Sequence, residues 1–373
     1  MQNGSSLKVL LVTEGSGGHL IPALQVAVLL ARHGAAIKVW YAKRQQTAPL
    51  AEALAQEATG AAIDMDPIPI RASSGPVERL RTCGRLWQKA QRCFDTFAPD
   101  VGVGFGGWVS APVVLAARRR RIGCLLHEQN VVMGRANQWL APWVDRVALS
   151  FRETQSRLNG TPTVITGLPV RPAIGSWSRT QAAERFGFSP DQPTLLVLGG
   201  SQGSRALNRL MAQVAGRLST EERRSWQVVH LTGSADAAVI QDAYVESRVR
   251  AWVAPWLVEM GPAYALADLV LARAGASTIA ELARCGIPAL LIPYPYAGAH
   301  QRANARLVEA VGGGVTLEES DATPERALAS MRQIFADERL RRMMGEQMRG
   351  LASADAAERL TETIVELARH SPL

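Results

Sequence analysis

The amino-acid sequence predicts an α/β fold of two Rossmann-like, doubly wound domains, each built on a parallel sheet. The chain has 373 residues, whereas a single hydrophobic core rarely grows beyond roughly 250–300 residues. Short apolar runs alternate with helical patterns, as expected when helices cover both faces of a parallel sheet. The pattern also begins twice, because Leu10–Thr13 and Leu195–Leu198 each lead into a glycine-rich turn.

The first half alternates strand-like and helix-like segments. Short apolar runs rich in β-branched residues are typical of buried strands, and longer runs with helical spacing are typical of helices. We expect strands at Leu7–Thr13, Ile37–Ala42, Val101–Gly104, Cys124–Leu126 and Arg146–Ser150, with helices at Leu20–Arg32 and Ala111–Arg119.

The second half repeats the alternation after a break. Gly167, Pro169 and Pro172 interrupt regular structure, so we expect a first domain over residues 1–167 and a second over 168–352. A final helix, about 353–373, is expected to pack back on the first domain. Within the second half we expect strands at Thr194–Leu198, Gln227–Leu231, Arg250–Ala254, Leu269–Ala272 and Ala289–Ile292, helices at Arg205–Leu218, Thr278–Cys285 and Gln301–Val311, and helical structure from Pro324 to His370.

Composition narrows the function classes. The formal net charge is +8 and the pI is about 9.8, which suits a nucleic acid, a phosphorylated substrate or an anionic membrane, or else serves solubility alone. The four cysteines, Cys83, Cys93, Cys124 and Cys285, form no CxxC pair, so we expect reduced thiols and a cytoplasmic protein. We find neither a signal peptide nor a run of the ~20 apolar residues that a membrane span needs, and therefore expect membrane contact to be peripheral.

The glycine-rich turns are candidate phosphate sites. A turn of this kind presents backbone N–H groups at the positive end of a helix, and Ser201 and Ser204 add hydroxyls to the second turn. A third cluster runs from Gly104 to Trp108. Neither strand–turn unit matches the GxGxxG or P-loop pattern, so nicotinamide cofactors and ATP are not favoured. A ligand-free packing turn is the alternative for each.

Polar side chains follow several expected strands. His19 and the run His127–Asn130 suit acid–base chemistry, because histidine titrates near neutral pH; a packing role is the alternative for His19. Glu281, expected in a first helical turn, either complements the helix dipole or accepts ribose hydroxyls. Gln301 and Asn304 share a helix face, either for a ligand or for solvent.

Basic segments form two candidate surfaces. Arg118–Arg121 is a run of four arginines, and residues 68–89 mix apolar and basic side chains. Such segments can meet anionic lipid. A solvated surface is the alternative for both.

Together these motifs resemble the MurG family of N-acetylglucosaminyltransferases in order and spacing, from about Leu7 to Val315. The resemblance implies a GT-B fold, in which two Rossmann-like domains face a cleft. The matching segments are Gly15-x-Gly17-Gly18-His19-x-x-Pro22, Gly106-Gly107-Trp108-Val109-Ser110-x-Pro112, His127–Asn130, Pro169-Val170-Arg171, Gly199–Gly203, Ala274–Glu281 and His300-Gln301-x-x-Asn304-Ala305.

The resemblance also implies roles for residues. His19 is the implied base, with Glu128 orienting or assisting it. UDP-N-acetylglucosamine is expected in the second domain, and a muramyl-pentapeptide on undecaprenyl diphosphate in the first. The implied donor contacts are Ser16, Gly17, Gly18, Asn130, Arg171, Gly200, Ser201, Gln202, Trp256, Leu257, Glu281, Gln301 and Asn304, and the implied acceptor contacts are Gly15, Gly106, Gly107, Trp108 and Ser110.

The chain departs from the family at three places. The family usually has threonine at Ser16 and asparagine at Leu168, and many members have aspartate at Ala299. The hydroxyl survives at Ser16, whereas Leu168 removes a polar contact.

The implied reaction is inverting transfer to the C4 hydroxyl of the acceptor, giving lipid II for peptidoglycan synthesis and so for cell shape and division. We expect no obligatory cofactor or metal, a peripheral place on the cytoplasmic face of the inner membrane, other cell-wall synthesis proteins as further partners, and no nucleic acid. The alternatives are a GT-B enzyme with another UDP-sugar or acceptor, a UDP-sugar epimerase, or a non-catalytic nucleotide-binding scaffold.

Overall fold

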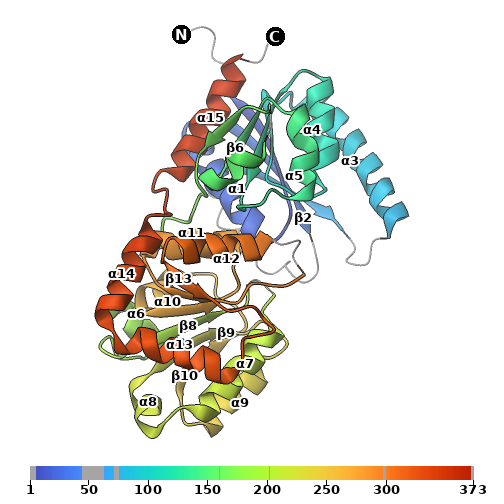
Figure 1. The fold of residues 1–373 in the computed structure, drawn as a ribbon. Coiled ribbons are helices and arrows are strands. Elements are labelled where there is room, and N and C mark those ends of the chain that lie inside the picture. Colours follow the sequence, from blue (N-terminus) through green and yellow to red (C-terminus); the bar gives the residue numbers. More distant parts are fainter. Residues whose placement is uncertain are drawn as a thin grey trace. The chain divides into compact units, whose positions relative to one another are not determined.

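The chain forms two compact units. The computed structural model describes residues 6–43, 63–70, 75–158, 160–200, 202–296 and 300–370. Unit 1 comprises residues 1–171 and 353–373, and unit 2 comprises residues 172–352 (Figure 1). Each unit is an α/β fold around a parallel sheet.

The sheet of unit 1 has the strand order β3-β2-β1-β4-β5-β6-β7, and every pairing is parallel. The order reverses between β1 and β4. Ligands of open α/β sheets bind beyond the carboxyl ends of the strands at such a switch point. The strands are β1 (Lys8–Thr13), β2 (Ala36–Lys43), β3 (Ile63–Pro69), β4 (Val101–Gly104), β5 (Gly123–Glu128), β6 (Arg146–Leu149) and β7 (Thr163–Ile165).

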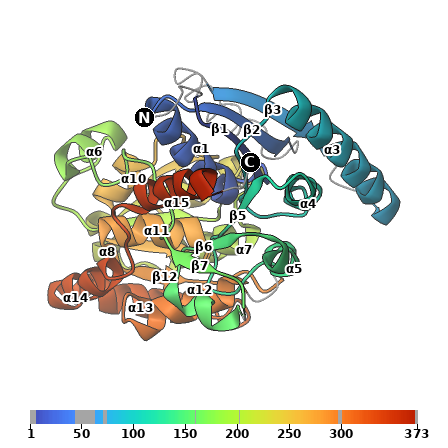
Figure 2. The ribbon, with the colours of Figure 1, turned by 90° about the horizontal axis from the view of Figure 1, so that it is seen from above.

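Helices cover both faces of this sheet because β1 is apolar on both sides. Val9 and Leu11 pack with α1 and α15, whereas Leu10 and Val12 pack with α3 and α4. The helices are α1 (Gly17–Arg32), α3 (Pro76–Thr96), α4 (Ser110–Arg119), α5 (Arg135–Leu140) and α15 (Ala356–His370), with the 3-10 turns η1 (Ala141–Trp143) and η2 (Arg152–Arg157). Helix α4 contacts both α3 and α5 (Figure 2).

The carboxyl-terminal segment belongs to unit 1. Leu360 and Ile364 of α15 are fully buried in the same cluster as the apolar face of α1, and Figure 2 shows the two helices side by side. The return is tight, since a Cβ on Gly167 would lie 2.3 Å from Cβ of Ser353. Unit 1 also keeps residues 168–171, beyond the boundary expected at 167/168; Leu168 there is 5% exposed, which suits an apolar residue.

The sheet of unit 2 has the order β10-β9-β8-β11-β12-β13, again with only parallel pairings. Its switch point lies between β8 and β11. The strands are β8 (Thr194–Leu198), β9 (Gln227–Leu231), β10 (Arg250–Ala254), β11 (Leu269–Ala272), β12 (Ala289–Leu291) and β13 (Gly314–Thr316). The helices are α6 (Arg179–Phe186), α7 (Arg205–Arg217), α8 (Thr220–Ser225), α9 (Ala237–Glu246), α10 (Gly261–Leu266), α11 (Ala276–Cys285), α12 (His300–Ala310), α13 (Pro324–Ala336) and α14 (Glu338–Arg349).

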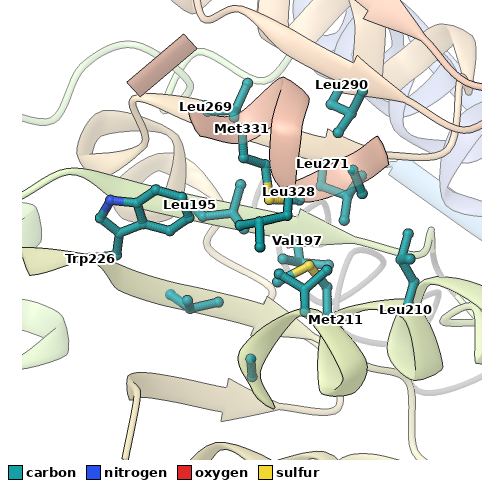
Figure 3. Packing of buried hydrophobic residues seen from close by; sticks show 14 of the residues in the cluster. Leu195, Val197, Leu210, Met211, Trp226, Leu269, Leu271, Leu290, Leu328 and Met331 are labelled. Atoms are coloured by element: carbon teal, nitrogen blue, oxygen red, sulfur yellow. The ribbon is translucent and has the colours of Figure 1, made fainter. Parts of the chain in front are cut away.

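One face of this sheet holds a core of strand and helix side chains. Leu195 and Val197 of β8 pack with Met211 of α7 and with Leu328 and Met331 of α13 (Figure 3). This packing holds α7 against β8, and so fixes where the turn between them lies.

The expected elements are present in the structure, but the helices α5, α6, α8, α9 and α10 were not expected. Strands β3, β7 and β13 were not expected. β3 contains Asp64, Asp66, Pro67 and Pro69, which disfavour strands except at a sheet edge, where it lies. The expected helical stretch from Pro324 is three helices, because the Asp337 side chain accepts a hydrogen bond from Leu340 N (2.9 Å) and starts α14 anew.

Candidate functional site

The first glycine turn lies at the switch point of unit 1. It joins β1 to α1, and Ser16 is the residue that precedes the helix. The turn touches the end of β2, since a Cβ on Gly15 would lie 1.7 Å from the carbonyl oxygen of Ala42. Gly15 therefore provides close packing, and Gly17 and Gly18 open the first turn of α1.

His19 is held by the residue that starts its helix. The Ser16 hydroxyl lies 2.9 Å from Nδ1 of His19. When Nδ1 carries the proton and donates it to Ser16, Nε2 has the lone pair that a general base needs. His19 is half-buried. Its ring faces the second glycine turn of unit 1, because a Cβ on Gly106 would lie 3.3 Å from Nε2.

The Gly106–Gly107 turn follows β4 on the other side of the switch point. Both glycines have positive φ, 86° and 82°. A Cβ on Gly107 would lie 2.0 Å from Cγ of Glu14, a buried carboxylate. The Ser110 hydroxyl donates to the carbonyl of Gly106 (2.9 Å) and Ser110 is 0% exposed. Ser110 thus supports the turn, and its expected contact with an acceptor stays a prediction; Trp108 beside it is half-buried.

Glu128 is fully engaged within its own loop. Its Oε1 accepts from N (2.9 Å) and Nδ2 (3.1 Å) of Asn130, and its Oε2 accepts from N of Gly134 (2.9 Å) and Nδ2 of Asn137 (2.9 Å). A carboxylate has about four acceptor positions, so these bonds fill them. Glu128 is also 1% exposed. Glu128 therefore holds the backbone and side chain of Asn130, and its expected assistance to His19 stays a prediction.

His127 and Glu128 belong to β5, which runs two residues beyond the expected Leu126. His127 is 0% exposed. Its Nε2 lies 3.2 Å from the carbonyl oxygen of Gly167 and its Nδ1 lies 3.2 Å from Nε2 of Gln129. Burial lowers the pKa of His127 to about 4. His127 is therefore a neutral residue of the framework.

The glycine turn of unit 2, which follows β8, lies at the switch point of that unit. Gly200 is exposed, has a φ of 86° and has no atom within 4 Å of an added Cβ, so its backbone is open to a ligand. Gln202 is exposed as well, and Ser201 lies outside the described residues. A Cβ on Gly203 would lie 2.0 Å from the carbonyl oxygen of Thr232. The turn after β8 is therefore wedged against the turn after β9.

Buried polar groups hold these two turns together. Asn208 of α7 donates to the carbonyl of Thr232 (2.9 Å) and to Asp236 (2.7 Å), while its Oδ1 lies 3.1 Å from Nε2 of His230. Nδ1 of His230 lies 2.9 Å from the hydroxyl of Tyr244. Burial lowers the pKa of His230 to about 3. His230 is thus neutral near pH 7 and holds Asn208 and Tyr244 in place.

The remaining expected donor contacts lie on loops and helix starts of unit 2. Trp256 is 45% exposed and, with Leu257, follows β10. Glu281 is 8% exposed and accepts a hydrogen bond from the hydroxyl of Tyr264 (2.7 Å). Helix α11 begins at Ala276 and has no acidic residue in its first turn, so the expectation that Glu281 lies in that turn was wrong.

Gln301 and Asn304 lie on α12 with different surroundings. The side-chain oxygen of Gln301 accepts from the backbone N–H of Tyr294 (2.9 Å), which ties α12 to the loop after β12. Asn304 is 0% exposed and donates to the carbonyl of Ala274 (3.1 Å), so it supports the start of α11; its expected contact with the donor stays a prediction. Ala299 lies outside the described residues.

Unit 1 thus brings Ser16, His19, Gly106 and Gly107 together, and unit 2 groups its glycine turn with other polar residues. Arg171 is half-buried and is the last residue of unit 1, whereas it was expected in the second domain. Sequence reasoning missed Arg273, which directly follows β11 at the switch point of unit 2. A charged residue immediately after a buried strand is the same signal that drew attention to His127–Asn130, so it could have been found.

Comparison with known proteins assigns the chain to a class. The glycosyltransferase family 28 N-terminal domain matches residues 9–149, and the family's C-terminal domain matches residues 194–360. The crystal structure of Acinetobacter baumannii MurG, 26% identical, covers 96% of this chain and 99% of its own, with a TM-score of 0.72. The chain has the GT-B fold of these glycosyltransferases.

Full-length relatives narrow the assignment. A protein from a Nocardioides species is 35% identical over 97% of this chain and 98% of its own length. A second protein, from Syntrophotalea carbinolica, is 36% identical over 95% of this chain and 97% of its own length. Both are named UDP-N-acetylglucosamine–N-acetylmuramyl-(pentapeptide) pyrophosphoryl-undecaprenol N-acetylglucosamine transferase. The chain belongs to the MurG family within glycosyltransferase family 28.

One further likeness concerns the fold alone. The UDP-N-acetylglucosamine 2-epimerase of Neisseria meningitidis, bound to its substrate, is 12% identical and covers 96% of this chain and all of its own, with a TM-score of 0.69. The same fold thus serves another reaction, so fold by itself does not choose the chemistry.

Proposed function

We propose that this protein transfers N-acetylglucosamine from its UDP donor to the C4 hydroxyl of the muramyl-pentapeptide on undecaprenyl diphosphate, giving lipid II. The observation that carries the proposal is the identity of about 35% over nearly the whole chain with enzymes named for this transfer. The open backbone at Gly200 and the Ser16–His19 pair support it, because they are suited to a diphosphate and to proton removal.

The donor is bound by unit 2. Gly200, Gln202 and Gly203 precede the start of α7, where the helix dipole favours an anion. Trp256 and Leu257 pack against uracil, Glu281 accepts the ribose hydroxyls, and Gln301 contacts the sugar with its amide. Arg171 and the α7 amino-terminus stabilise the departing UDP. Because these groups supply the positive charge, the reaction needs no metal cofactor.

The acceptor is bound by unit 1. The glycine turn before α1 cradles its diphosphate, although the resemblance places Gly17 and Gly18 among the donor contacts. The Gly106–Gly107 turn and Trp108 contact the rest of the head group. His19 removes the proton from the C4 hydroxyl through Nε2, while Ser16 holds Nδ1. Attack from the face opposite UDP inverts the anomeric carbon, through a transition state with oxocarbenium character. Asn130, positioned by Glu128, contacts the donor sugar.

The surface of α3 meets the membrane peripherally, on the cytoplasmic leaflet. Leu80 is 75% exposed between the exposed Arg79 and Arg81. Two exposed tryptophans beside α4, Trp139 (59%) and Trp143 (53%), add the amphipathic side chains typical of interfaces. Among the described residues, no helix is both long enough and apolar enough to span a bilayer. Basic and apolar side chains of this kind bind anionic lipid surfaces.

The test is transfer of radiolabelled N-acetylglucosamine from its UDP donor to a lipid-linked muramyl-pentapeptide, with a no-acceptor control. Labelled disaccharide-lipid that forms only with acceptor is the expected result. Conversion of the donor to its C2 epimer without acceptor identifies an epimerase instead. UDP binding with neither reaction identifies a scaffold and overturns the proposal.

A further inference from the structure

Arg273 occupies the switch point of unit 2. It directly follows β11, and its backbone N–H donates to the carbonyl of Leu198 at the end of β8 (3.2 Å). The residue is 8% exposed. A buried cation therefore lies at the carboxyl edge of the sheet, between the two strands where a doubly wound fold binds its ligand.

The guanidinium of Arg273 joins three separate segments. Nε donates to the hydroxyl oxygen of Ser204, the N-cap of α7 (3.2 Å). Nη1 donates to the carbonyls of Ile292 (3.1 Å) and Pro293 (3.4 Å), which follow β12. Nη2 forms an ion pair with Glu319, beyond β13. A guanidinium is planar, and its N–H donors point outward in that plane in several fixed directions. The ammonium of lysine cannot reproduce this set.

Two of these segments carry the proposed donor contacts. Ser204 ends the glycine turn that contains Gly200. Pro293 precedes Tyr294, whose backbone N–H holds the side-chain oxygen of Gln301 (2.9 Å). The centre of the Tyr294 ring lies 5.5 Å from the Arg273 guanidinium carbon. Arg273 therefore sets the spacing between the diphosphate turn and the Gln301 loop.

The bond to Ser204 also orients a hydroxyl. The Ser204 oxygen accepts from Nε of Arg273 and from the backbone N–H of Leu207 (3.4 Å). A hydroxyl has two acceptor lone pairs and one donor hydrogen. With both lone pairs engaged, the O–H hydrogen points away from these two donors and can be given to an anion.

We propose that Arg273 is a positioning residue for the UDP-sugar, which holds the diphosphate turn and the Gln301 loop in register and orients the Ser204 hydroxyl as a donor. This inference rests on the proposed function, since it assumes that unit 2 binds UDP. It predicts a defect in donor affinity that a general loss of stability does not produce.

Arg179, which pairs with the residue before β11, offers a matched control at the other end of that strand. Arg179 forms an ion pair with Asp268 (2.8 Å), the residue before β11, and donates to the carbonyls of Leu266 (2.9 Å) and Gln192 (3.1 Å). Arg179 thus has an ion pair and carbonyl bonds much as Arg273 has, but at the amino-terminal edge, away from the turn 199–204. Its loss is expected to lower stability without changing donor affinity.

The experiment measures UDP binding by calorimetry and thermal unfolding for the full chain and its variants Arg273→Met, Arg273→Lys, Ser204→Ala and Arg179→Met. We expect the Kd for UDP to rise about tenfold in Arg273→Met, since several charge-assisted hydrogen bonds are lost. Arg273→Lys should restore little of this. Arg179→Met should unfold at a lower temperature but bind UDP within about twofold of the parent.

Ser204→Ala is a second variant that tests the proposal if Arg273→Met does not fold. We expect a rise in the Kd for UDP of about threefold, and a smaller additional rise when Ser204→Ala is added to Arg273→Lys, because both changes break the Arg273–Ser204 bond and Ser204→Ala also removes the hydroxyl itself. In transfer assays of the Arg273 and Ser204 variants, the KM for the donor should rise, while kcat at saturating donor stays within about threefold of the parent.

Three results would each contradict the proposed role of Arg273. Parental UDP affinity in both Arg273 variants overturns the positioning role. Equal weakening in Arg179→Met and Arg273→Met also overturns it, because the effect then follows stability. If the parent protein itself binds no UDP, the proposed donor site fails and this inference fails with it.

Discussion

Replacing Ser16 with alanine removes the hydroxyl that lies 2.9 Å from Nδ1 of His19. A base at Nε2 requires the proton on Nδ1, and the Ser16 oxygen is placed to accept a hydrogen bond from that N–H. A hydrogen bond of this kind contributes about 1 kcal/mol, which corresponds to roughly a fivefold fall in kcat. Ser16→Thr keeps the hydroxyl and should stay within about twofold of the parent.

The assay is kcat for transfer at saturating donor and acceptor, measured across pH, with UDP affinity as the control for an intact donor site. His19→Gln should lower kcat by about 10²–10⁴, the usual contribution of a general base, and should remove the fall in kcat at low pH that protonation of the base causes. Near-parental kcat in His19→Gln refutes the base assignment. An unchanged kcat in Ser16→Ala at every pH refutes the tautomer argument while leaving His19 as the base.

Three further predictions concern the framework of the site. Burial lowers the pKa values of His127 and His230 to about 4 and about 3, so the unfolded chain binds protons more readily. The contribution of these neutral histidines to the free energy of unfolding is therefore complete above pH 6.5 and is lost as the pH falls toward 4. In urea titrations each unit should lose about 2 kcal/mol between pH 7 and pH 5, and His127→Gln should abolish this loss for unit 1. Gly107→Ala should lower stability by more than about 2 kcal/mol, since its Cβ would lie 2.0 Å from Cγ of Glu14, whereas Gly34→Ala, with the same φ of 82° and nothing within 4 Å, should cost about 1 kcal/mol in thermal unfolding. Glu128→Gln leaves donors around one oxygen unpaired and should lower stability by about 2–3 kcal/mol in urea titrations; parental stability with a large loss of kcat instead returns Glu128 to a catalytic role.

Local sequence determined the regular elements and the class of site. Val101–Gly104, Thr194–Leu198 and Leu269–Ala272 were expected with the bounds that the structure shows, because apolar runs closed by glycine or polar residues define buried strands without reference to other parts of the chain. The same short-range signals located both glycine turns and His19. The order of these motifs also indicated the family, which the full-length comparisons confirm.

Tertiary structure alone decided what each polar residue does. Asn208 reaches His230 and Thr232, more than twenty residues away, and no local pattern indicates those partners. The edge strand β3 exists because β2 supplies its hydrogen bonds, against the preference of its prolines and aspartates. Arg273 gains its place from Ser204, Ile292 and Glu319, which lie far from it in sequence. Strand formation responds mainly to neighbouring residues, whereas burial and hydrogen bonding of a side chain depend on which segments meet, and that is set only when the sheet assembles.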